Sequence, residues 1–152
     1  MPYVLLIEDN PLNAEVVIFL LRSINLEVKH TLRGLEGAKM ARQERPALIL
    51  MDYDLPDVDG RTLALLLKKQ LGDTDAPPIV AVTAREGRYE EKLAKQFGCA
   101  AFVSKPIDDD KFIALIQGLI SLPQDRASKE KSTSGNSETG DYQRTPSDPP
   151  VV

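Results

Sequence analysis

The segment Leu50-Met-Asp-Tyr-Asp-Leu-Pro-Asp-Val-Asp-Gly60 gives the clearest indication of the fold. Its first two residues end a short apolar run, Ala47–Met51, and acidic residues begin at Asp52. A run that is apolar at every position is typical of a strand covered on both faces by helices. The acids that follow mark the carboxyl end of that strand, where parallel sheets place their sites.

The rest of the first 122 residues repeats this pattern of an apolar run followed by a helical segment. Continuous apolar runs at Tyr3–Ile7, Ile79–Val82 and Ala100–Val103 predict three more buried strands, and the alternating Leu26–His30 predicts an edge strand. Helical spacing and end signals predict five helices, one beginning at Asn10 and Pro11 and the others over Arg33–Glu44, Arg61–Leu71, Glu86–Phe97 and Asp108–Leu122.

Five strand–helix repeats predict a doubly wound α/β fold, in which a five-stranded parallel sheet carries helices on both faces. Each helix is expected to bury an apolar stripe against the sheet. The expected stripe residues are Val16, Val17, Leu20 and Leu21; Leu35, Ala38 and Ala41; Leu63, Leu66, Leu67 and Leu71; Leu93, Ala94 and Phe97; and Phe112, Leu115, Ile116, Leu119 and Ile120.

Composition divides the chain into a domain over residues 1–122 and a flexible, disordered polar tail over residues 123–152. The tail has only four apolar residues, too few to offset the entropy lost on folding. A net charge of −4 without a Lys/Arg block argues against nucleic acid as a partner. The lone Cys99, the early acids and the lack of a long apolar run predict a cytoplasmic protein that has no disulfide, signal peptide or membrane span.

Polar residues follow the predicted strands at the same edge of the sheet. Glu8 and Asp9 follow the first strand, Asp52 the third, Thr83 the fourth and Lys105 the fifth. Three carboxylates in one place repel one another unless a cation is present, and Mg²⁺ is a hard cation that prefers such oxygens. With a metal on one side and an ammonium on the other, the remaining carboxylate can attack a phosphoryl group.

Four stretches in order resemble the response-regulator receiver domain over residues 1–122, which implies the flavodoxin-like receiver fold. They are Val4-Leu-Leu-Ile-Glu-Asp-Asn10, Leu50–Gly60, Ala81-Val-Thr-Ala84 and Phe102-Val-Ser-Lys-Pro106. The Asp9-Asn-Pro-Leu-Asn13 run is most similar to single-domain receivers of the cell-cycle phosphorelay type and to receivers of hybrid kinases.

This resemblance implies a role for each matching residue. Asp52 matches the phosphoacceptor, and Thr83 and Lys105 match the hydroxyl and the lysine that contact the phosphoryl group. Phe102 matches an aromatic switch. The resemblance further implies Mg²⁺, with Mn²⁺ as a substitute, held by Glu8, Asp9, Asp52 and the backbone carbonyl of Asp54; a Lys105–Pro106 bond that is usually cis; and a loop glycine at Gly60.

The function implied is a phosphorylation switch rather than a turnover enzyme. A histidine kinase or a histidine phosphotransfer protein donates the phosphoryl group, and the protein then loses it slowly. The surface over about residues 86–122 is expected to bind a downstream protein. Receivers commonly pair through their last helices, which leaves a homodimer open.

Two alternatives remain open at this point. Asp52-Tyr53-Asp54 after an apolar strand imitates the paired acids of haloacid-dehalogenase phosphatases, although that family places them on its first strand and adds a substrate cap. The fold could also serve as an interaction module that is never phosphorylated, against which the complete set of acids, threonine and lysine argues.

Four further residues have interpretations of their own. His30, the single histidine, is interpreted as structural, and Cys99 as a small packing residue. Asp54 and Arg85 depart from common receiver patterns and flank the route of the attacking water. A salt bridge between them is the hypothesis that predicts slow self-dephosphorylation, and two independent solvated charges are the alternative.

Overall fold

Five parallel strands form one sheet in the order β2-β1-β3-β4-β5 in the computed structural model, which describes residues 2–72, 76–84, 92 and 96–120. This confirms the predicted doubly wound fold. In chain order the elements are β1 (Tyr3–Ile7), α1 (Pro11–Ser23), β2 (Glu27–Thr31), α2 (Gly34–Gln43), β3 (Leu48–Asp52), α3 (Gly60–Leu71), β4 (Ile79–Thr83) and β5 (Ala101–Ser104), and residues 109–120 form a further helix.

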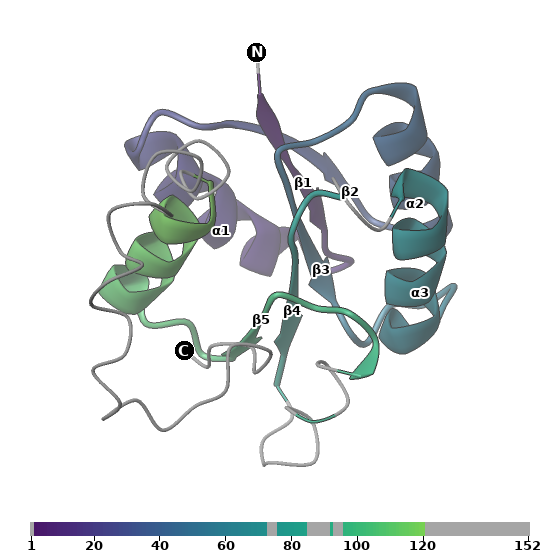
Figure 1. Cartoon of the computed structure of the whole chain (residues 1–152). Helices are drawn as coiled ribbons and strands as arrows, with labels where there is room; N and C mark the ends of the chain where they lie inside the picture. Colours follow the sequence, from purple (N-terminus) through teal and green to yellow (C-terminus); the bar gives the residue numbers. More distant parts are fainter. Residues whose placement is uncertain (1, 73–75, 85–91, 93–95, 121–152) are drawn as a thin grey trace, which may run out of the picture.

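Helices cover both faces of the sheet (Figure 1). Helix α1 and helix 109–120 lie on one side, and α2 and α3 lie together on the other. Side chains alternate between the two sides along each strand, so a strand covered on both sides must be apolar at every position. Strands β1, β3 and β4 are accordingly buried throughout, whereas the edge strand β2 is only partly buried.

The alternation divides the core into two clusters. Within β1, Leu5 and Ile7 join the cluster that packs under α2 and α3, together with Leu63 and Leu67. Residues Val4 and Leu6 point the other way and pack with Val17, Leu20 and Leu21 of α1 and with Phe112 and Ile116 of helix 109–120.

Helix α1 begins as the sequence predicts. The Asn10 side chain accepts hydrogen bonds from the backbone N–H groups of Leu12 (2.9 Å) and Asn13 (3.2 Å). Pro11 occupies the first turn, where a missing N–H leaves no intrahelical bond unmade. The helix therefore starts immediately after Glu8 and Asp9, which keeps these acids at the end of the strand.

The prediction of buried apolar stripes is wrong for three residues. The side chains of Val16, Leu35 and Leu66 are exposed, by 52%, 54% and 37% respectively. Their helices rest on a sheet surface that contacts only a narrow stripe, so a residue at the stripe's margin faces solvent. On α1 the margin is strongly apolar, because Leu12 and Phe19 are exposed as well.

Some predictions fall outside the described residues. Most of the helix predicted over Glu86–Phe97 lies there, as do Arg85 and the tail, so these remain predictions. In the ranges that the structure does describe, no helix combines the length and the apolar character that crossing a bilayer requires.

Candidate functional site

The sheet topology brings four of the sequence-predicted side chains to one edge. Asp52 is the last residue of β3, the middle strand, and Thr83 is the last residue of β4. Glu8 directly follows β1, and Lys105 directly follows β5. Because β1, β3 and β4 are neighbours in the sheet, residues from across the sequence meet at the carboxyl end of the central strand.

Three carboxylates form the acidic side of the site. Glu8, Asp9 and Asp52 each offer a carboxylate oxygen, and these atoms all lie within 4.8 Å of one another. Glu8 and Asp52 are only 3% and 5% exposed, while Asp9 faces solvent. Burial raises the pKa of Glu8, and the nearby charge of Asp52 adds to this against the opposing Asn10 N–H and Lys105.

Lys105 supplies the balancing positive charge. Its Nζ lies 3.0 Å from Asp52 Oδ2 and 3.2 Å from Glu8 Oε1, and the side chain is 20% exposed. Burial alone lowers the pKa of Lys105, but the hydrogen bonds and charges of Asp52 and Glu8 outweigh burial and raise it. The ammonium is therefore held in its charged form between two buried acids.

The donor set fits a hard divalent cation. Carboxylate oxygens are the ligands that Mg²⁺ prefers, and three of them converge here from two adjoining strand ends. One ammonium cannot balance three carboxylates, so a divalent cation would relieve the remaining repulsion. Glu8, Asp9 and Asp52 are thus the side chains that could hold Mg²⁺ or Mn²⁺.

Asp52 is fixed by a hydrogen bond to each of its oxygens. Its Oδ1 accepts from the Asp54 backbone N–H at 2.9 Å, and its Oδ2 accepts from Lys105 Nζ at 3.0 Å. Each oxygen keeps further lone pairs. The carboxylate is consequently oriented while it retains the electron pairs that a nucleophile needs.

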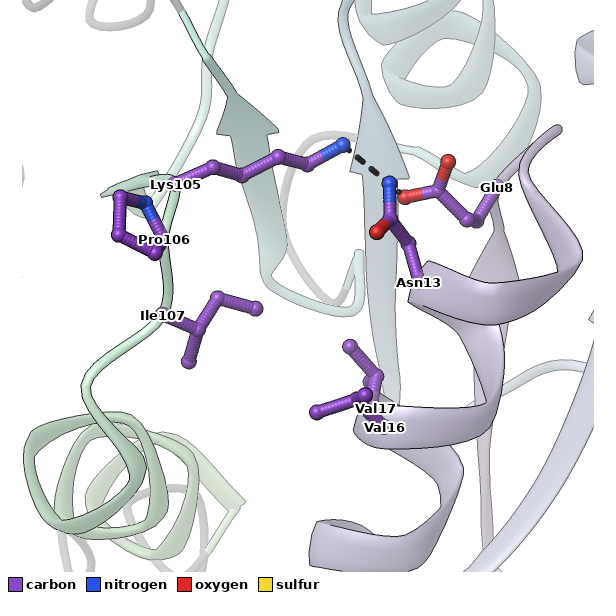
Figure 2. Close-up of a pocket in the computed structure, with 7 residues that line it drawn as sticks. All are labelled: Glu8, Asn13, Val16, Val17, Lys105, Pro106 and Ile107. Carbon is purple, nitrogen blue, oxygen red and sulfur yellow. Dashed lines mark hydrogen bonds and ion pairs between the residues drawn. The ribbon is translucent and has the colours of Figure 1, made fainter.

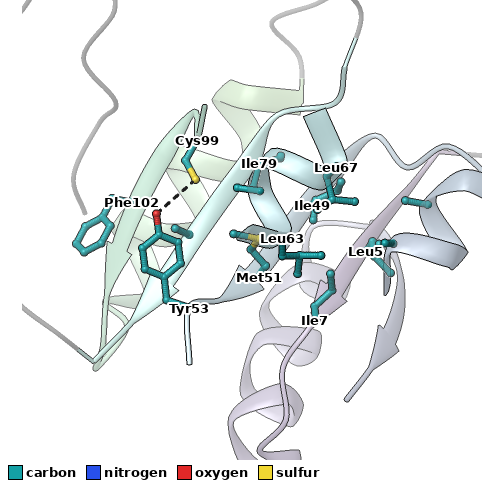
Figure 3. Close-up of a cluster of buried hydrophobic side chains, with 14 of the residues drawn as sticks. Leu5, Ile7, Ile49, Met51, Tyr53, Leu63, Leu67, Ile79, Cys99 and Phe102 are labelled. Atoms are coloured by element: carbon teal, nitrogen blue, oxygen red, sulfur yellow. Dashed lines mark hydrogen bonds between the residues drawn. The ribbon is translucent and has the colours of Figure 1, made fainter. Parts of the chain in front are cut away.

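Thr83 ends β4 at this edge, and Phe102 lies on the adjacent strand β5, two residues before the strand ends. Both are buried, and the Thr83 carbonyl accepts a hydrogen bond from the Lys105 backbone N–H at 2.9 Å. Phe102 belongs to a core cluster with Tyr53 and Cys99, whose Oη and Sγ atoms are 3.9 Å apart (Figure 3). This burial agrees with the interpretation of Cys99 as a packing residue.

The loop after Asp52 closes on itself. The Gly60 N–H donates to the Tyr53 carbonyl at 3.1 Å. A Cβ atom at Gly60 would lie 2.6 Å from Tyr53 Cα, closer than non-bonded carbons can approach. The backbone itself therefore requires glycine here. The Lys105–Pro106 peptide bond on the opposite rim is cis, as the resemblance implies.

A pocket of about 250 Å³ opens beside the site, between α1 and the segment after β5. Figure 2 shows Lys105 and Glu8 reaching toward each other at one end, with Val16 and Val17 facing Ile107 at the other. Asn13 and Pro106 complete the lining. The charged site thus continues directly into an apolar surface.

Two residues that the sequence did not assign to the site contact its loops, and the contact of His30 agrees with its structural interpretation. His30 Nε2 lies 2.8 Å from the Glu8 carbonyl oxygen, and because a carbonyl only accepts, Nε2 carries the proton. Asp57 binds the first two amides of α2. Only the parallel register of β1 and β2 could have predicted the contact of His30 with Glu8. The signal for Asp57 is Arg33, a poor capping residue, which leaves the first amides of α2 in need of another acceptor.

Comparison with known proteins agrees with this geometry. A family model for the response regulator receiver domain matches residues 4–117. The polar-differentiation response regulator DivK of Brucella anthropi is 39% identical over 120 residues, which cover 77% of this chain and 94% of that protein.

Two solved structures share the fold. The receiver domain of the sensor histidine kinase PA1611 from Pseudomonas aeruginosa, which has a magnesium ion coordinated in its active-site cleft, superposes with a TM-score of 0.71 at 29% identity, covering 79% of this chain and 98% of that one. A chain from the complex of the Saccharomyces cerevisiae phosphotransfer protein Ypd1 with the Ssk1 receiver domain gives 0.72 at 26% identity, covering 80% and 90%.

Proposed function

This chain belongs to the response regulator receiver domain family, and on that premise we propose that it accepts a phosphoryl group on Asp52 and thereby switches its binding to a partner protein. The observation that carries the proposal is the pairing of a buried, doubly hydrogen-bonded Asp52 with Lys105 beside two further acids. Such a site suits a single transfer rather than repeated turnover, because the product remains bonded to the protein.

The reaction is an in-line displacement at phosphorus. An Asp52 oxygen attacks, the new O–P bond forms, and the bond to the donor's leaving atom breaks with its electron pair on that atom. Lys105, already 3.0 Å from Asp52 Oδ2, is placed to neutralise charge on the phosphoryl oxygens. Bound Mg²⁺ would supply further charge neutralisation, held by Glu8, Asp9, Asp52 and the backbone carbonyl of Asp54. Water later attacks the phosphorus and releases Asp52.

Labelling with acetyl phosphate tests the acceptor. We expect wild-type protein with Mg²⁺ to gain one phosphoryl group, detected by mass spectrometry, and the Asp52→Asn variant to gain none. Asp59→Asn is the matched control, because Asp59 is an exposed acid of the same loop that pairs with Arg61. Labelling of Asp52→Asn at the wild-type level would contradict the assignment, and repeated phosphate release from a small phosphomonoester would favour the phosphatase alternative.

The switch is proposed to reach the partner surface through Thr83 and Phe102. Both residues are buried, Thr83 at the end of β4 and Phe102 on the adjacent strand β5, which lies within residues 96–120. Pulldown with wild type and Asp52→Asn, each with and without beryllofluoride, tests this step. We expect a partner whose capture changes with beryllofluoride only in the wild type. Partners indifferent to both changes would leave the receiver as an unphosphorylated interaction module.

The phosphodonor is proposed to be a histidine kinase or a histidine phosphotransfer protein that docks on α1. Leu12, Val16 and Phe19 are exposed and spaced so that they share one helix face. Val16 also lines the pocket that ends at Lys105. A protein that delivers a phosphoryl group to Asp52 has to cover this rim, and the related Ssk1 receiver was solved bound to a phosphotransfer protein.

A substitution on this face separates docking from chemistry. We expect Phe19→Ser to slow phosphotransfer from the kinases and phosphotransfer proteins of the same genome while acetyl phosphate labels it at the wild-type rate. Leu65→Ser is the control, since Leu65 is an exposed leucine on α3, across the sheet. Equal transfer to both variants would contradict donor docking on α1.

A further inference from the structure

Helix α2 begins without a capping side chain of its own. Arg33 occupies the capping position and makes no side-chain hydrogen bond there. The Asp57 carboxylate takes its place: Oδ1 accepts from the Gly34 N–H at 2.8 Å, and Oδ2 accepts from the Leu35 N–H at 2.9 Å. Asp57 belongs to the loop between β3 and α3, residues 53–59, which follows Asp52 and is called the acceptor loop. One side chain therefore joins the first turn of α2 to the acceptor loop.

The residues just before α2 also contact the segment that carries Glu8 and Asp9. The Glu8 N–H donates to the Thr31 carbonyl at 3.0 Å, and His30 Nε2 donates to the Glu8 carbonyl at 2.8 Å. Residues 30–35 therefore anchor both segments that supply the acids of the site. The pairing of β1 with β3 already places Glu8 near Asp52, and this shared anchor adds a second connection between Glu8 and the loop beyond Asp52.

Packing leaves the anchored loop little freedom. A Cβ atom at Gly34 would meet Val58 Cγ1 at 2.4 Å, so the loop lies directly against the start of α2. Although partial desolvation opposes it, hydrogen bonding to the Leu35 and Gly34 amides, with the charge of Arg33, lowers the pKa of Asp57. Asp57 is consequently ionised at neutral pH, and its charge is engaged at α2.

We propose that Asp57 is a positioning residue for the metal site. Its two hydrogen bonds hold the loop so that the Asp54 carbonyl and the Asp52 carboxylate stay at the right separation from Glu8 and Asp9 to bind Mg²⁺ together. This inference rests on the proposed function, because it assigns Asp57 to the same phosphoacceptor site. Residues that orient metal ligands typically change metal affinity about tenfold or more when removed.

Magnesium titration of three variants tests this role. Asp57→Ala removes both acceptors, Asp57→Asn retains one, and Asp59→Ala alters an acid of the same loop whose carboxylate pairs with Arg61. We expect calorimetry to give a Mg²⁺ dissociation constant about tenfold higher for Asp57→Ala than for wild type. Asp57→Asn should give an intermediate value, and Asp59→Ala should give the wild-type value. Hydrogen exchange at the Gly34 and Leu35 amides should accelerate in the same order.

The acetyl phosphate reaction then distinguishes the two levels of the proposal. We expect Asp57→Ala to need more Mg²⁺ for half-maximal labelling but to approach the wild-type rate at saturation. Wild-type protein that neither binds Mg²⁺ nor becomes labelled would overturn the proposed function itself. A labelled wild type together with Asp57 variants that are less stable to urea yet bind Mg²⁺ normally would overturn only this inference, because Asp57 would then be a helix cap alone.

Discussion

Lys105 Nζ lies 3.0 Å from Asp52 Oδ2, although the two residues are 53 positions apart in the chain. The same ammonium also reaches Glu8, 97 positions away. One cation is thus shared between two nearly buried carboxylates from different strands. The balance of charge at this point decides how the site responds to metal, to pH and to substitution.

Replacing Lys105 should make the folded protein more dependent on Mg²⁺. In Lys105→Met, the Glu8 and Asp52 carboxylates lose their cation. We expect the free energy of unfolding to fall by about 2 kcal/mol. This is less than for a fully buried pair, because the Lys105 side chain is 20% exposed. Mg²⁺ binds the same oxygens, so it should raise the melting temperature more in the variant than in wild type, by differential scanning calorimetry.

Lys29→Met is the matched control, since Lys29 forms an exposed ion pair with Glu44 away from the site. It should leave the magnesium effect unchanged. Charged Lys105 stabilises the folded protein at neutral pH. This stabilisation is lost only as pH rises above 10.5, because the pKa of Lys105 is raised in the folded state. A magnesium effect of equal size in Lys105→Met and wild type would contradict the shared-cation interpretation.

Glu8→Gln should stabilise the metal-free protein and weaken Mg²⁺ binding. Burial raises the pKa of Glu8, which means that the ionised side chain destabilises the folded protein. We therefore expect the neutral Gln to raise the free energy of unfolding by about 1 kcal/mol. Above the ordinary value of 4.5 the folded wild type holds more protons than the unfolded chain, so its stability falls with pH relative to the variant.

Urea unfolding in the presence of a chelator, repeated over a pH series, measures this difference. The advantage of Glu8→Gln should grow from acid to neutral pH. An advantage that stays constant with pH, or a variant less stable than wild type at neutral pH, would show that ionised Glu8 is not a source of strain.

Gly60→Ala should be strongly destabilising, whereas Gly118→Ala should not. The added Cβ meets Tyr53 Cα at 2.6 Å in the first case and no atom within 4 Å in the second. Overpacking against backbone costs about 1–3 kcal/mol, while alanine in an open helical position gains up to about 1 kcal/mol. Urea denaturation of both variants checks the contrast, and equal stabilities would contradict the tight closure of the acceptor loop.

Cys99 should resist thiol reagents until the protein unfolds. The side chain is 7% exposed, and burial raises the pKa of the thiol to about 11. At mildly alkaline pH, Ellman's reagent should react slowly with native protein and rapidly in urea. A Cys99→Ser/Ser23→Cys double variant, which moves the thiol to the exposed end of α1, should react rapidly without urea. Rapid native reaction of Cys99 would be inconsistent with its packing.

His30 should report metal binding, because its Nε2–H donates to the carbonyl of Glu8. As the single histidine it gives one set of imidazole resonances. We expect the Nε2 signal in ¹⁵N NMR to move during a Mg²⁺ titration of wild type and to stay in place in Glu8→Gln. A ring signal that ignores Mg²⁺ in wild-type protein that demonstrably binds it would show that this contact is not coupled to the site.

The apolar runs were the reliable part of the sequence. Strands β1, β3, β4 and β5 begin within one residue of the predicted positions, because a strand buried on both faces must be apolar throughout. The helical stripes were less reliable: Val16 and Leu35 satisfy helical spacing yet are exposed. Periodicity gives the direction of an apolar face, and the width of that face depends on the surface it meets.

The amino-acid sequence was sufficient to predict the βα repeat, the edge of the sheet where the polar residues gather and the family to which their motifs belong. All three follow from local order along the chain, since each strand carries its terminal acid, hydroxyl or lysine with it. The folded structure was needed to show that Lys105 contacts both Asp52 and Glu8, that His30 donates to the Glu8 carbonyl and that Asp57 caps α2. These contacts depend on strand order and on loops packing across the sheet, and no local pattern encodes a distance between segments that meet only in the folded chain.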